Sequence, residues 1–378
     1  MTDYDVLIIG GGPAGSTLAW SLRDSGLKIA ILDKSDFPRD KICAGWVTPA
    51  VMEELQLDLT DYAKQNVLQP VHGFRVSQIG GREVDTPLEK EIVSYGIRRF
   101  EFDNYLLKRC QAEFIANTKF KSMTYADGYW TVNEQYRARL VIGGGGHFCP
   151  VARAIGARPG NSERIVAAQE IEFEMTDEQK AQCPVSGEMP ELFFCEDLEG
   201  YGWLVRKGDY LNIGLGREDN HKLSEHVSAF VQMLKKQGKI PFDTPEKFHG
   251  HAYLLYPHAK REVVADGVML IGDAAGLAYP QSGEGIRPAV ETAMMAASTI
   301  KSVAGNYSSA ALQLYRQQME ARFGERQPAP DFLERLPLFL KQFFARHLLA
   351  SRWFAQHVVM DRWFLHRQQA PLVCEQTD

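Results

Sequence analysis

The amino-acid sequence predicts an α/β protein with a Rossmann-like, dinucleotide-binding domain, an inserted antiparallel β-sheet domain and a helical C-terminus. Two glycine-rich turns, each placed between a buried strand and a helix, predict the Rossmann-like domain. Stretches of alternating apolar and polar residues between these turns are typical of an antiparallel sheet. Beyond residue 306, apolar residues recur every three or four positions, which indicates amphipathic helices.

The composition is that of a globular chain large enough for two or three domains. Of 378 residues, 45% are hydrophobic and 24% are charged, values that exclude both a disordered and a membrane-embedded protein. The net charge of -6 gives no basis for a nucleic-acid partner, because proteins that bind nucleic acid present a strongly basic face. We therefore expect an enzyme-sized body with space for a cofactor.

Cysteine usage and the first residues predict the compartment. The six cysteines include no CxxC pair, so we expect neither a metal site nor a disulfide framework. Met1 is followed by Thr-Asp-Tyr-Asp and then at once by a predicted strand, which leaves no space for the segments of a signal peptide. These observations predict a cytoplasmic protein with reduced thiols.

The first glycine-rich turn follows a continuous apolar run, Val6 to Ile9, that predicts a strand buried on both faces. Its G-x-G-x-x-G pattern supplies a tight turn, the close approach of a pyrophosphate, and helix-on-strand packing. A helix should follow, with Gly26 as its C-terminal cap, and then a buried strand over 28–32 that ends beside a carboxylate suited to a ribose hydroxyl. The cofactor residues predicted here are Gly10, Gly12, Pro13, Ala14, Gly15, Asp33 and Lys34.

The second glycine-rich turn begins at a buried strand, Val268 to Ile271, and leads to a long apolar helix over 286–300. Asp273 stands at the strand end, where a carboxylate can accept hydrogen bonds from a polyol chain. The glycines before the helix let backbone N–H groups meet negative charge at its positive end. An ordinary strand-turn-helix is the alternative interpretation. The residues predicted to contact the cofactor here are Gly272, Asp273, Gly283, Gly285 and Ile286.

With both turns in place, the chain resembles the FAD-dependent oxidoreductases related to para-hydroxybenzoate hydroxylase and, within them, the geranylgeranyl reductase group. The resemblance implies FAD as the cofactor, with Asp273 on its ribityl chain and the helix after Gly285 directed at the flavin ring. Arg99 opens a segment similar to the family's R-x-x-F-D, whose arginine approaches the FAD. Gly145 stands where the family has an aspartate, so either backbone amides of the glycine run replace that carboxylate or the run is a close-packed turn.

A predicted hairpin over 200–216 carries two candidate catalytic residues, Tyr201 and Trp203. Alternation places them with Val205 on one face, a flat aromatic surface suited to an apolar substrate. The segment is similar to the reductase group's Y-x-W-x-F-P followed by G-x-G, although Val205 and Arg206 replace the Phe-Pro pair. The W-x-W-x-I-P pattern of the tryptophan halogenases fits less well. An aromatic face that belongs only to the core is the structural alternative.

The loop after the second strand carries the third candidate catalytic residue, Cys43. The segment Cys-Ala-Gly45 partly matches a Cys-Gly element of the geranylgeranyl reductases, and the resemblance places this loop beside the isoalloxazine ring. A thiol near a flavin can donate a proton or tune the ring, whereas a small buried residue is the alternative. Four histidines without a visible partner are expected on the surface or in the core: His147, His249, His251 and His258.

Residues 335–367 form an electrostatically separate segment, with six basic residues against one acid, Asp361. The pattern predicts two amphipathic helices split near Ala350, and charges interrupt them too often for a transmembrane span. Such helices can cover the core, cap a substrate tunnel, contact a protein partner or lie on an anionic membrane. Peripheral membrane contact by a cytoplasmic protein is therefore one of our expectations.

These motifs divide the chain into three parts. We predict a discontinuous FAD-binding domain over 1–70, 96–162 and 260–305, a substrate-binding sheet domain over 71–95 and 163–259, and C-terminal amphipathic helices over 306–378. Strand-like segments at 165–174 and 191–195, with a short helix at 226–234, support the inserted domain.

The leading functional hypothesis is an FAD enzyme whose reduced flavin transfers a hydride to a C=C bond of a small apolar substrate, such as an isoprenoid. An external donor (NADPH, NADH or ferredoxin) would supply the electrons, because the chain has no second G-x-G-x-x-G for a permanent nicotinamide. The first alternative is a monooxygenase that hydroxylates an aromatic substrate, including a side chain of another protein, and a halogenase ranks below it. A non-enzymatic, flavin-holding module docked through the basic tail is the third hypothesis.

Overall fold

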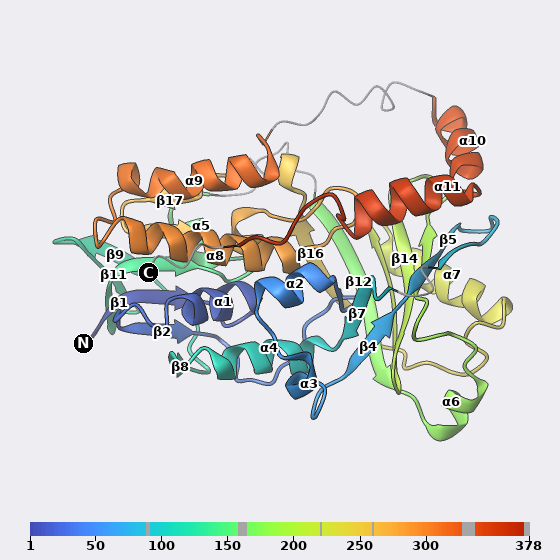
Figure 1. The fold of residues 1–378 in the computed structure, drawn as a ribbon, viewed down its shortest axis with the longest axis horizontal. Helices are drawn as coiled ribbons and strands as arrows, with labels where there is room; N and C mark the ends of the chain where they lie inside the picture. Colours follow the sequence, from blue (N-terminus) through green and yellow to red (C-terminus); the bar gives the residue numbers. More distant parts are fainter. Residues whose placement is uncertain (88–90, 158–164, 220, 259–260, 327–336, 374–378) are drawn as a thin grey trace.

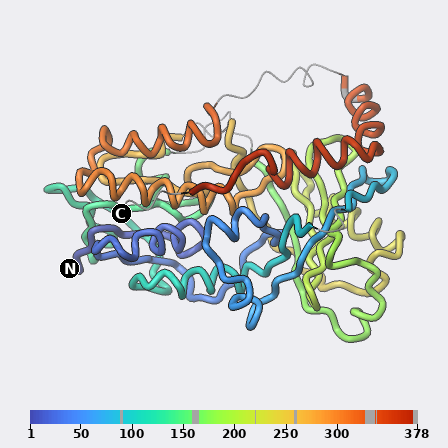
Figure 2. Tube along the Cα trace, in the orientation of Figure 1, coloured from blue at the N-terminus to red at the C-terminus, as the bar shows by residue number. Residues whose placement is uncertain are grey.

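The computed structural model describes residues 1–378 apart from 88–90, 158–164, 220, 259–260, 327–336 and 374–378. A parallel sheet with its helices occupies one end of the molecule and a large second sheet occupies the other, as Figure 1 shows. The chain passes between these two parts several times (Figure 2). The predicted fold class is confirmed. The domain limits given above remain predictions.

Buried apolar strands build the parallel sheet. Its path runs β17 (Val264–Ala265), β18 (Val268–Leu270), β11 (Tyr136–Gly143), β1 (Thr2–Ile9), β2 (Ile29–Leu32) and β8 (Glu113–Ile115). Neighbouring strands are parallel except for β17 and β18, and the hairpin β9 (Met123–Ala126) and β10 (Tyr129–Val132) pairs antiparallel with β11. All of β2 and residues 6–9 of β1 are buried, as their continuous apolar sequence predicted.

The helices of this part pack on the sheet and on one another. The first helix, α1 (Pro13–Ser21), contacts α4 (Arg99–Arg109) and α8 (Ile286–Ser302), and α9 (Ser309–Phe323) packs on α8. The prediction that Gly26 caps α1 is wrong, because the helix closes at Leu22 and Gly26 takes its left-handed φ of +73° in the turn beyond. The shorter elements are α2 (Pro49–Glu54), α3 (Leu59–Tyr62), α5 (Pro150–Ala154) and the 3₁₀ turns Tyr256–His258 and Gly272–Ala275.

The second sheet has seven strands in the described part of the chain. Their order is β16 (His249–Leu254), β12 (Ile165–Glu174), β15 (Tyr210–Arg217), β14 (Gly200–Lys207), β13 (Glu191–Phe194), β5 (Gly73–Gln78) and β6 (Val84–Pro87). The predicted hairpin is β14 and β15, paired in register from Gly200 with Arg217 to Lys207 with Tyr210. The sheet is antiparallel except between β13 and β5, which are parallel.

Helices cover both faces of the second sheet. On one face, α7 (Leu223–Lys236) buries Phe230 against Phe193, and α6 (Asp177–Gln182) follows β12.

A separate three-stranded antiparallel sheet consists of β3 (Trp46–Val47), β7 (Ser94–Ile97) and β4 (Leu68–Val71), in that order. Its strand β4 leads along the chain into β5 of the second sheet.

The C-terminal segment covers the other face of the second sheet. It comprises α10 (Leu338–Leu349), α11 (Arg352–Phe354) and a π-helix over Ala355–Phe364, so the predicted split near Ala350 is confirmed. Val359 and Phe364 are fully buried in one core cluster with Trp203 and Val205 of the hairpin. The chain then returns to α8, where Arg287 donates hydrogen bonds to the carbonyl groups of residues 369 and 370 (Figure 1).

Candidate active site

The first glycine-rich turn forms a backbone cradle at the carboxyl end of β1. Gly10 has φ +115°, and a Cβ there would lie 2.5 Å from the carbonyl oxygen of Gly144. A Cβ on Gly15 would lie 1.9 Å from the carbonyl oxygen of Gly10, so α1 can pack this close to the strand only with glycine. Pro13 begins α1, and the free N–H groups of this helix terminus suit a pyrophosphate.

Asp33 stands at the end of β2 and is tied to the same cradle. Its Oδ2 accepts a hydrogen bond from the N–H of Gly11 at 2.8 Å, and its Oδ1 accepts one from the N–H of Ser35 at 2.9 Å. These bonds fix the carboxylate at the cradle and leave it acceptor capacity for a ribose hydroxyl.

A cavity of about 1060 Å³ runs from this cradle to the second sheet. Most of the residues predicted from the sequence line it: Gly10, Gly12, Pro13, Ala14, Asp33, Lys34, Cys43, Arg99, Tyr201, Trp203, Asp273, Gly283, Gly285 and Ile286. Gly15 and Gly272 do not line it. Gly15 provides helix packing, and Gly272, with φ +59°, donates its N–H to Thr292 Oγ1 at 3.0 Å.

Arg99 reaches the cavity from the start of α4 but is already paired. Its guanidinium donates to both oxygens of Asp103, at 2.7 and 2.8 Å, and Arg39 lies 3.2 Å from the same carboxylate. The Asp103 side chain is fully buried, so this ion pair holds the two arginines along one wall of the cavity.

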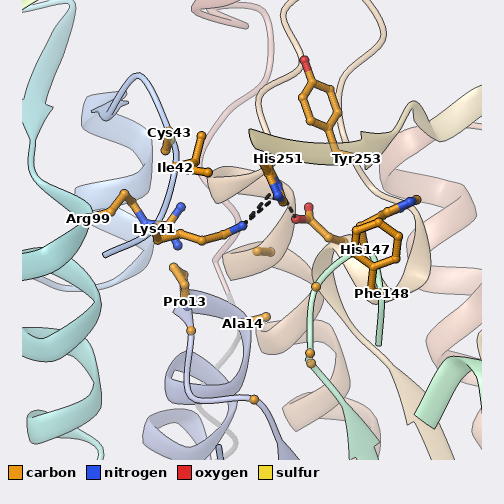
Figure 3. A pocket seen from close by; sticks show the side chains of 18 of the residues that line it. Pro13, Ala14, Lys41, Ile42, Cys43, Arg99, His147, Phe148, His251 and Tyr253 are labelled. Atoms are coloured by element: carbon orange, nitrogen blue, oxygen red, sulfur yellow. Dashed lines mark hydrogen bonds and ion pairs between the residues drawn. The ribbon is translucent and has the colours of Figure 1, made fainter. Parts of the chain in front are cut away.

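A lysine, a histidine and a carboxylate meet in the middle of the cavity, a group that the sequence analysis missed (Figure 3). Lys41 Nζ lies 3.1 Å from His251 Nδ1, and His251 Nε2 lies 4.0 Å from Asp273 Oδ2. Burial and the nearby Arg99 lower the pKa of Lys41 to about 8. Burial and the Lys41 charge lower the pKa of His251 to about 3, so this imidazole is neutral and accepts from the ammonium group.

His147 and Gly145 shape the wall opposite Lys41. His147 is buried, burial lowers its pKa to about 4, and its Nδ1 has no hydrogen-bond partner among the described residues. A Cβ on Gly145 would lie 3.3 to 3.4 Å from Pro150 and Cys149, so the start of α5 leaves little space for the aspartate side chain of relatives. The run is closely packed at Gly145 but open at Gly146, and residues 144–146 line the cavity, so both interpretations of the glycine run remain predictions.

These features fit FAD. We call the part of the cavity beside the two glycine-rich turns the cofactor half and the part beside Trp203 the substrate half. In the cofactor half, the glycine cradle and the N-terminus of α1 suit a pyrophosphate. Asp33 and Asp273 suit the ribose and ribityl groups, and the buried Lys41 adds a positive charge. The cavity volume lies at the upper end of the range for ligand sites, as so long a cofactor needs. We propose that the backbone N–H groups of Gly12 and Ala14 hold the pyrophosphate, Asp33 the ribose and Asp273 the ribityl chain.

The loop that carries Cys43 is fastened to the second sheet by its backbone. The N–H of Cys43 donates to Glu170 Oε1 at 2.5 Å, and the carbonyl oxygen of Cys43 accepts from Asn212 Nδ2 at 3.2 Å. The fully buried Lys207 donates to the carbonyl oxygens of Ala44 and Ile97, at 3.1 and 3.0 Å, and pairs with Glu172. Because these groups hold the main chain, the Cys43 side chain is left to line the cavity.

Trp203 occupies the space that a glycine leaves on the neighbouring strand. A Cβ on Gly214 would lie 2.2 Å from Trp203 Cζ2, and Trp203 Nε1 donates to Asn212 Oδ1 at 2.7 Å. Tyr201 donates its hydroxyl hydrogen to the carbonyl oxygen of Ser282, and its ring lies 5.3 Å from that of Phe364 in the tail. The tail therefore backs the aromatic end of the cavity.

A parallel sheet with a glycine cradle, a carboxylate on the next strand and a second glycine turn defines a dinucleotide-binding flavoprotein, and the chain is an FAD-dependent oxidoreductase. It belongs to the FAD binding domain family, which matches residues 3–325. The predicted cofactor and the resemblance to the geranylgeranyl reductase group are confirmed by this match and by its relatives.

Two relatives and one solved structure illustrate the similarity. The chain is 26% identical over 325 residues to the digeranylgeranylglycerophospholipid reductase of Methanocaldococcus jannaschii, covering 82% of this chain and 78% of the relative. It is 29% identical over 332 residues to the menaquinone reductase of Mycobacterium tuberculosis, covering 79% and 76%. A geranylgeranyl bacteriochlorophyll reductase-like protein of Thermoplasma acidophilum shares the fold, with a TM-score of 0.75, 22% identity, and coverage of 93% of this chain and 88% of that one.

Proposed function

We propose that this enzyme reduces a carbon–carbon double bond of an apolar, isoprenoid-type substrate. The observation that carries the proposal is the aromatic end of the cavity, where Tyr201 and Trp203 are fixed by hydrogen bonds and backed by Phe364, and which is continuous with the cofactor half. FAD, when bound and reduced, supplies the hydride for such a reduction. The relatives named above support the substrate class.

Within this proposal the protein positions the alkene and excludes water. Trp203 and Tyr201 have their polar atoms satisfied by Asn212 and Ser282, so their rings present apolar surface to a substrate without an unpaired donor. Cys43 lines the same space on a fastened loop and remains our predicted third catalytic residue. The expected electron donor is NADPH, NADH or ferredoxin.

Product analysis tests this proposal. FAD-loaded enzyme is reduced with dithionite under nitrogen and incubated separately with geranylgeranyl diphosphate and with a menaquinone. We expect from at least one probe a product that is heavier by two hydrogens per turnover and that keeps this mass after the quinone ring has been reoxidised in air. Oxidised enzyme is the matched control and should give none. If neither probe is reduced, and the reduced enzyme instead reacts with oxygen to hydroxylate an aromatic probe, the monooxygenase hypothesis replaces ours.

We also propose that α10 rests on an anionic membrane surface. Four of its apolar side chains are exposed, Phe339, Phe343, Phe344 and Leu348, and Trp353 just beyond the helix is 66% exposed. Lys341, Arg346 and Arg352 accompany them, and residues 337–360 contain no acid. Exposed aromatic rings beside basic residues suit an interface with anionic lipid. In the described part of the chain, no helix has the length and hydropathy of a bilayer span.

Vesicle sedimentation tests the membrane proposal. Wild-type enzyme should pellet with vesicles that contain phosphatidylglycerol, less with pure phosphatidylcholine, and less again at high salt. Phe343→Ser with Trp353→Ser should reduce the bound fraction, whereas Leu314→Ser, which removes an exposed leucine on α9, should not. Equal sedimentation of both variants and wild type would contradict the proposal.

A further inference from the structure

A buried carboxyl group lies in the substrate half of the cavity and has no partner for one of its oxygens. Glu170, in the middle of β12, is 4% exposed and lines the cavity beside Trp203 and Cys43. Its Oε1 accepts the hydrogen bond from the N–H of Cys43, while its Oε2 makes no hydrogen bond to any described residue. When a buried carboxyl oxygen has no hydrogen-bond donor, the charged carboxylate form is strongly disfavoured. Burial of the neutral, protonated form costs much less free energy.

The charged groups around Glu170 do not compensate for its burial. Lys207, which could neutralise it, pairs with Glu172, and the Asn212 amide donates to the carbonyl of Cys43 and to Glu172. Burial and the nearby Glu172 charge raise the pKa of Glu170 to about 7, and they outweigh the lowering by the Cys43 N–H, Lys207 and the Asn212 amide. Glu170 is thus about half protonated at pH 7 and mostly protonated below it.

The strand geometry directs this group toward the substrate half. Glu170 pairs with Gly214 on β15, and the missing side chain at Gly214 gives room to both the Trp203 ring and the Glu170 stem. Alternation along β12 places Ala168 and Glu170 on the same face, and both line the cavity. Glu284 is also buried, lines the cavity and has no hydrogen-bond partner for either oxygen among the described residues, but it stands between Gly283 and Gly285, which we predict to contact the FAD.

We propose that Glu170 is the acid that protonates the substrate carbon during double-bond reduction. The inference rests on the function proposed above and adds the proton donor to it. As the C=C π bond breaks, one carbon receives a hydride with its electron pair from the reduced FAD. The other carbon forms its new C–H bond with the Glu170 proton, and the resulting carboxylate regains a proton from solvent.

The test combines three variants with a readout that needs no turnover. Glu170→Gln removes the acid and keeps its shape, Glu170→Asp keeps a shortened acid, and Glu174→Gln makes the same exchange on the same face of β12 at an exposed position. Infrared spectra of the oxidised, FAD-loaded proteins across pH 5 to 9 report a protonated carboxyl group directly. Burial also raises the pKa of Glu284 to about 7, so its band is common to all the proteins. We expect the difference between the wild-type and Glu170→Gln spectra to contain a band that disappears as the pH rises through about 7, and the difference between wild type and Glu174→Gln to contain none.

Kinetics of the reduced proteins complete the test. Mixed with geranylgeranyl diphosphate, Glu170→Gln should oxidise its flavin at least about a hundredfold more slowly than wild type, the usual effect of losing a general acid. Wild type should slow as the pH rises above about 7, because the protonated form is then lost, and Glu170→Asp should recover part of the rate. FAD content should be the same in all four proteins.

Two results would overturn the role of Glu170. One is wild-type kinetics and an unchanged pH profile in Glu170→Gln, and the other is the same titrating carboxyl bands in wild type and Glu170→Gln. If Glu170→Gln is not obtained as folded protein, the infrared difference between wild type and Glu170→Asp and the rate of Glu170→Asp decide in the same way. Failure of the proposed function looks different, since the band would titrate while wild type and Glu174→Gln alike fail to reduce any prenyl probe.

Discussion

The two halves of the cavity are built by different means. Backbone from short, continuous segments makes the cofactor half: the turn at 10–15, the end of β2 and the turn before α8. Side chains from segments far apart in the sequence make the substrate half, where Cys43, Glu170, Trp203 and Asn212 meet through hydrogen bonds. A site built from backbone tolerates substitution of nearby side chains but not of its glycines. A site built from side chains keeps its geometry only if each of its hydrogen bonds is retained.

The largest expected effect is in the cofactor half. Gly15→Ala places a Cβ 1.9 Å from the Gly10 carbonyl oxygen and should abolish FAD binding, because α1 can no longer approach the cradle. The ratio of flavin to protein absorbance measures this. Gly26→Ala, after the same helix, meets nothing within 4 Å and should retain FAD, at a cost of about 1 kcal/mol for its positive φ. Equal FAD content in both variants would show that the cradle is not where FAD binds.

The next effect concerns the fastening of the substrate half. Lys207→Met leaves two buried carbonyl groups without their donor and removes the ammonium partner of Glu172, which keeps Arg98 and Asn212. It should lower the free energy of unfolding by about 3 kcal/mol. Lys180→Met removes a partly exposed ammonium whose partner Asp177 is fully exposed, and it should change the free energy of unfolding little. Urea denaturation compares the two. If Lys207→Met is as stable as Lys180→Met, the polar fastening is not required for the fold.

Asp273→Ala should weaken FAD binding less than Gly15→Ala and leave the substrate half unchanged. Loss of a charge-assisted hydrogen bond to the ribityl chain should weaken FAD binding by about 10- to 100-fold, while the folded substrate half persists. Quenching of flavin fluorescence on binding measures the dissociation constant. The control, Asp24→Ala, removes an exposed carboxylate on the same domain and should bind FAD normally. Full FAD retention in Asp273→Ala would undo this assignment.

The smallest effect is a pH dependence of cofactor binding. Burial lowers the pKa of Lys41 to about 8, so its positive charge is present below this pH and is lost as the pH rises through it. FAD carries negative charge, which raises that pKa on binding, so affinity should fall several-fold between pH 7 and 10. In Lys41→Gln the affinity should be weaker at pH 7 and less dependent on pH, whereas Lys28→Gln should match wild type. An identical pH profile in Lys41→Gln would remove Lys41 from the cofactor site.

The contrast between the halves also explains what the sequence could predict. Strand, glycine turn and terminal carboxylate are consecutive, so Gly10, Asp33 and Asp273 could be placed in one site from local patterns alone. Glu170 and His251 were missed because they enter the cavity through the pairing of β12 with β15 and β16, which no local pattern specifies. One signal was available, since alternation along 165–174 puts Glu170 and Glu172 on one face of a strand otherwise rich in apolar residues.

The tail shows the same limit. Its helical periodicity and its split were predictable, but the burial of Phe364 against Tyr201 depends on the return of the chain across the second sheet. The wrong cap at Gly26 has a local cause, because Leu22 closes α1 through backbone bonds to Leu18 and Ala19 before the glycine is reached.

Stopped-flow oxidation of the reduced enzyme tests the central claim most directly. Anaerobically reduced, FAD-loaded protein is mixed in parallel with geranylgeranyl diphosphate, with a menaquinone and with oxygen, and flavin absorbance is followed. Our account predicts rapid oxidation by a prenyl probe, with one saturated bond formed per flavin, and slower reaction with oxygen. Rapid oxidation by oxygen through a transient hydroperoxide spectrum, with no oxidation by either prenyl probe, would contradict it.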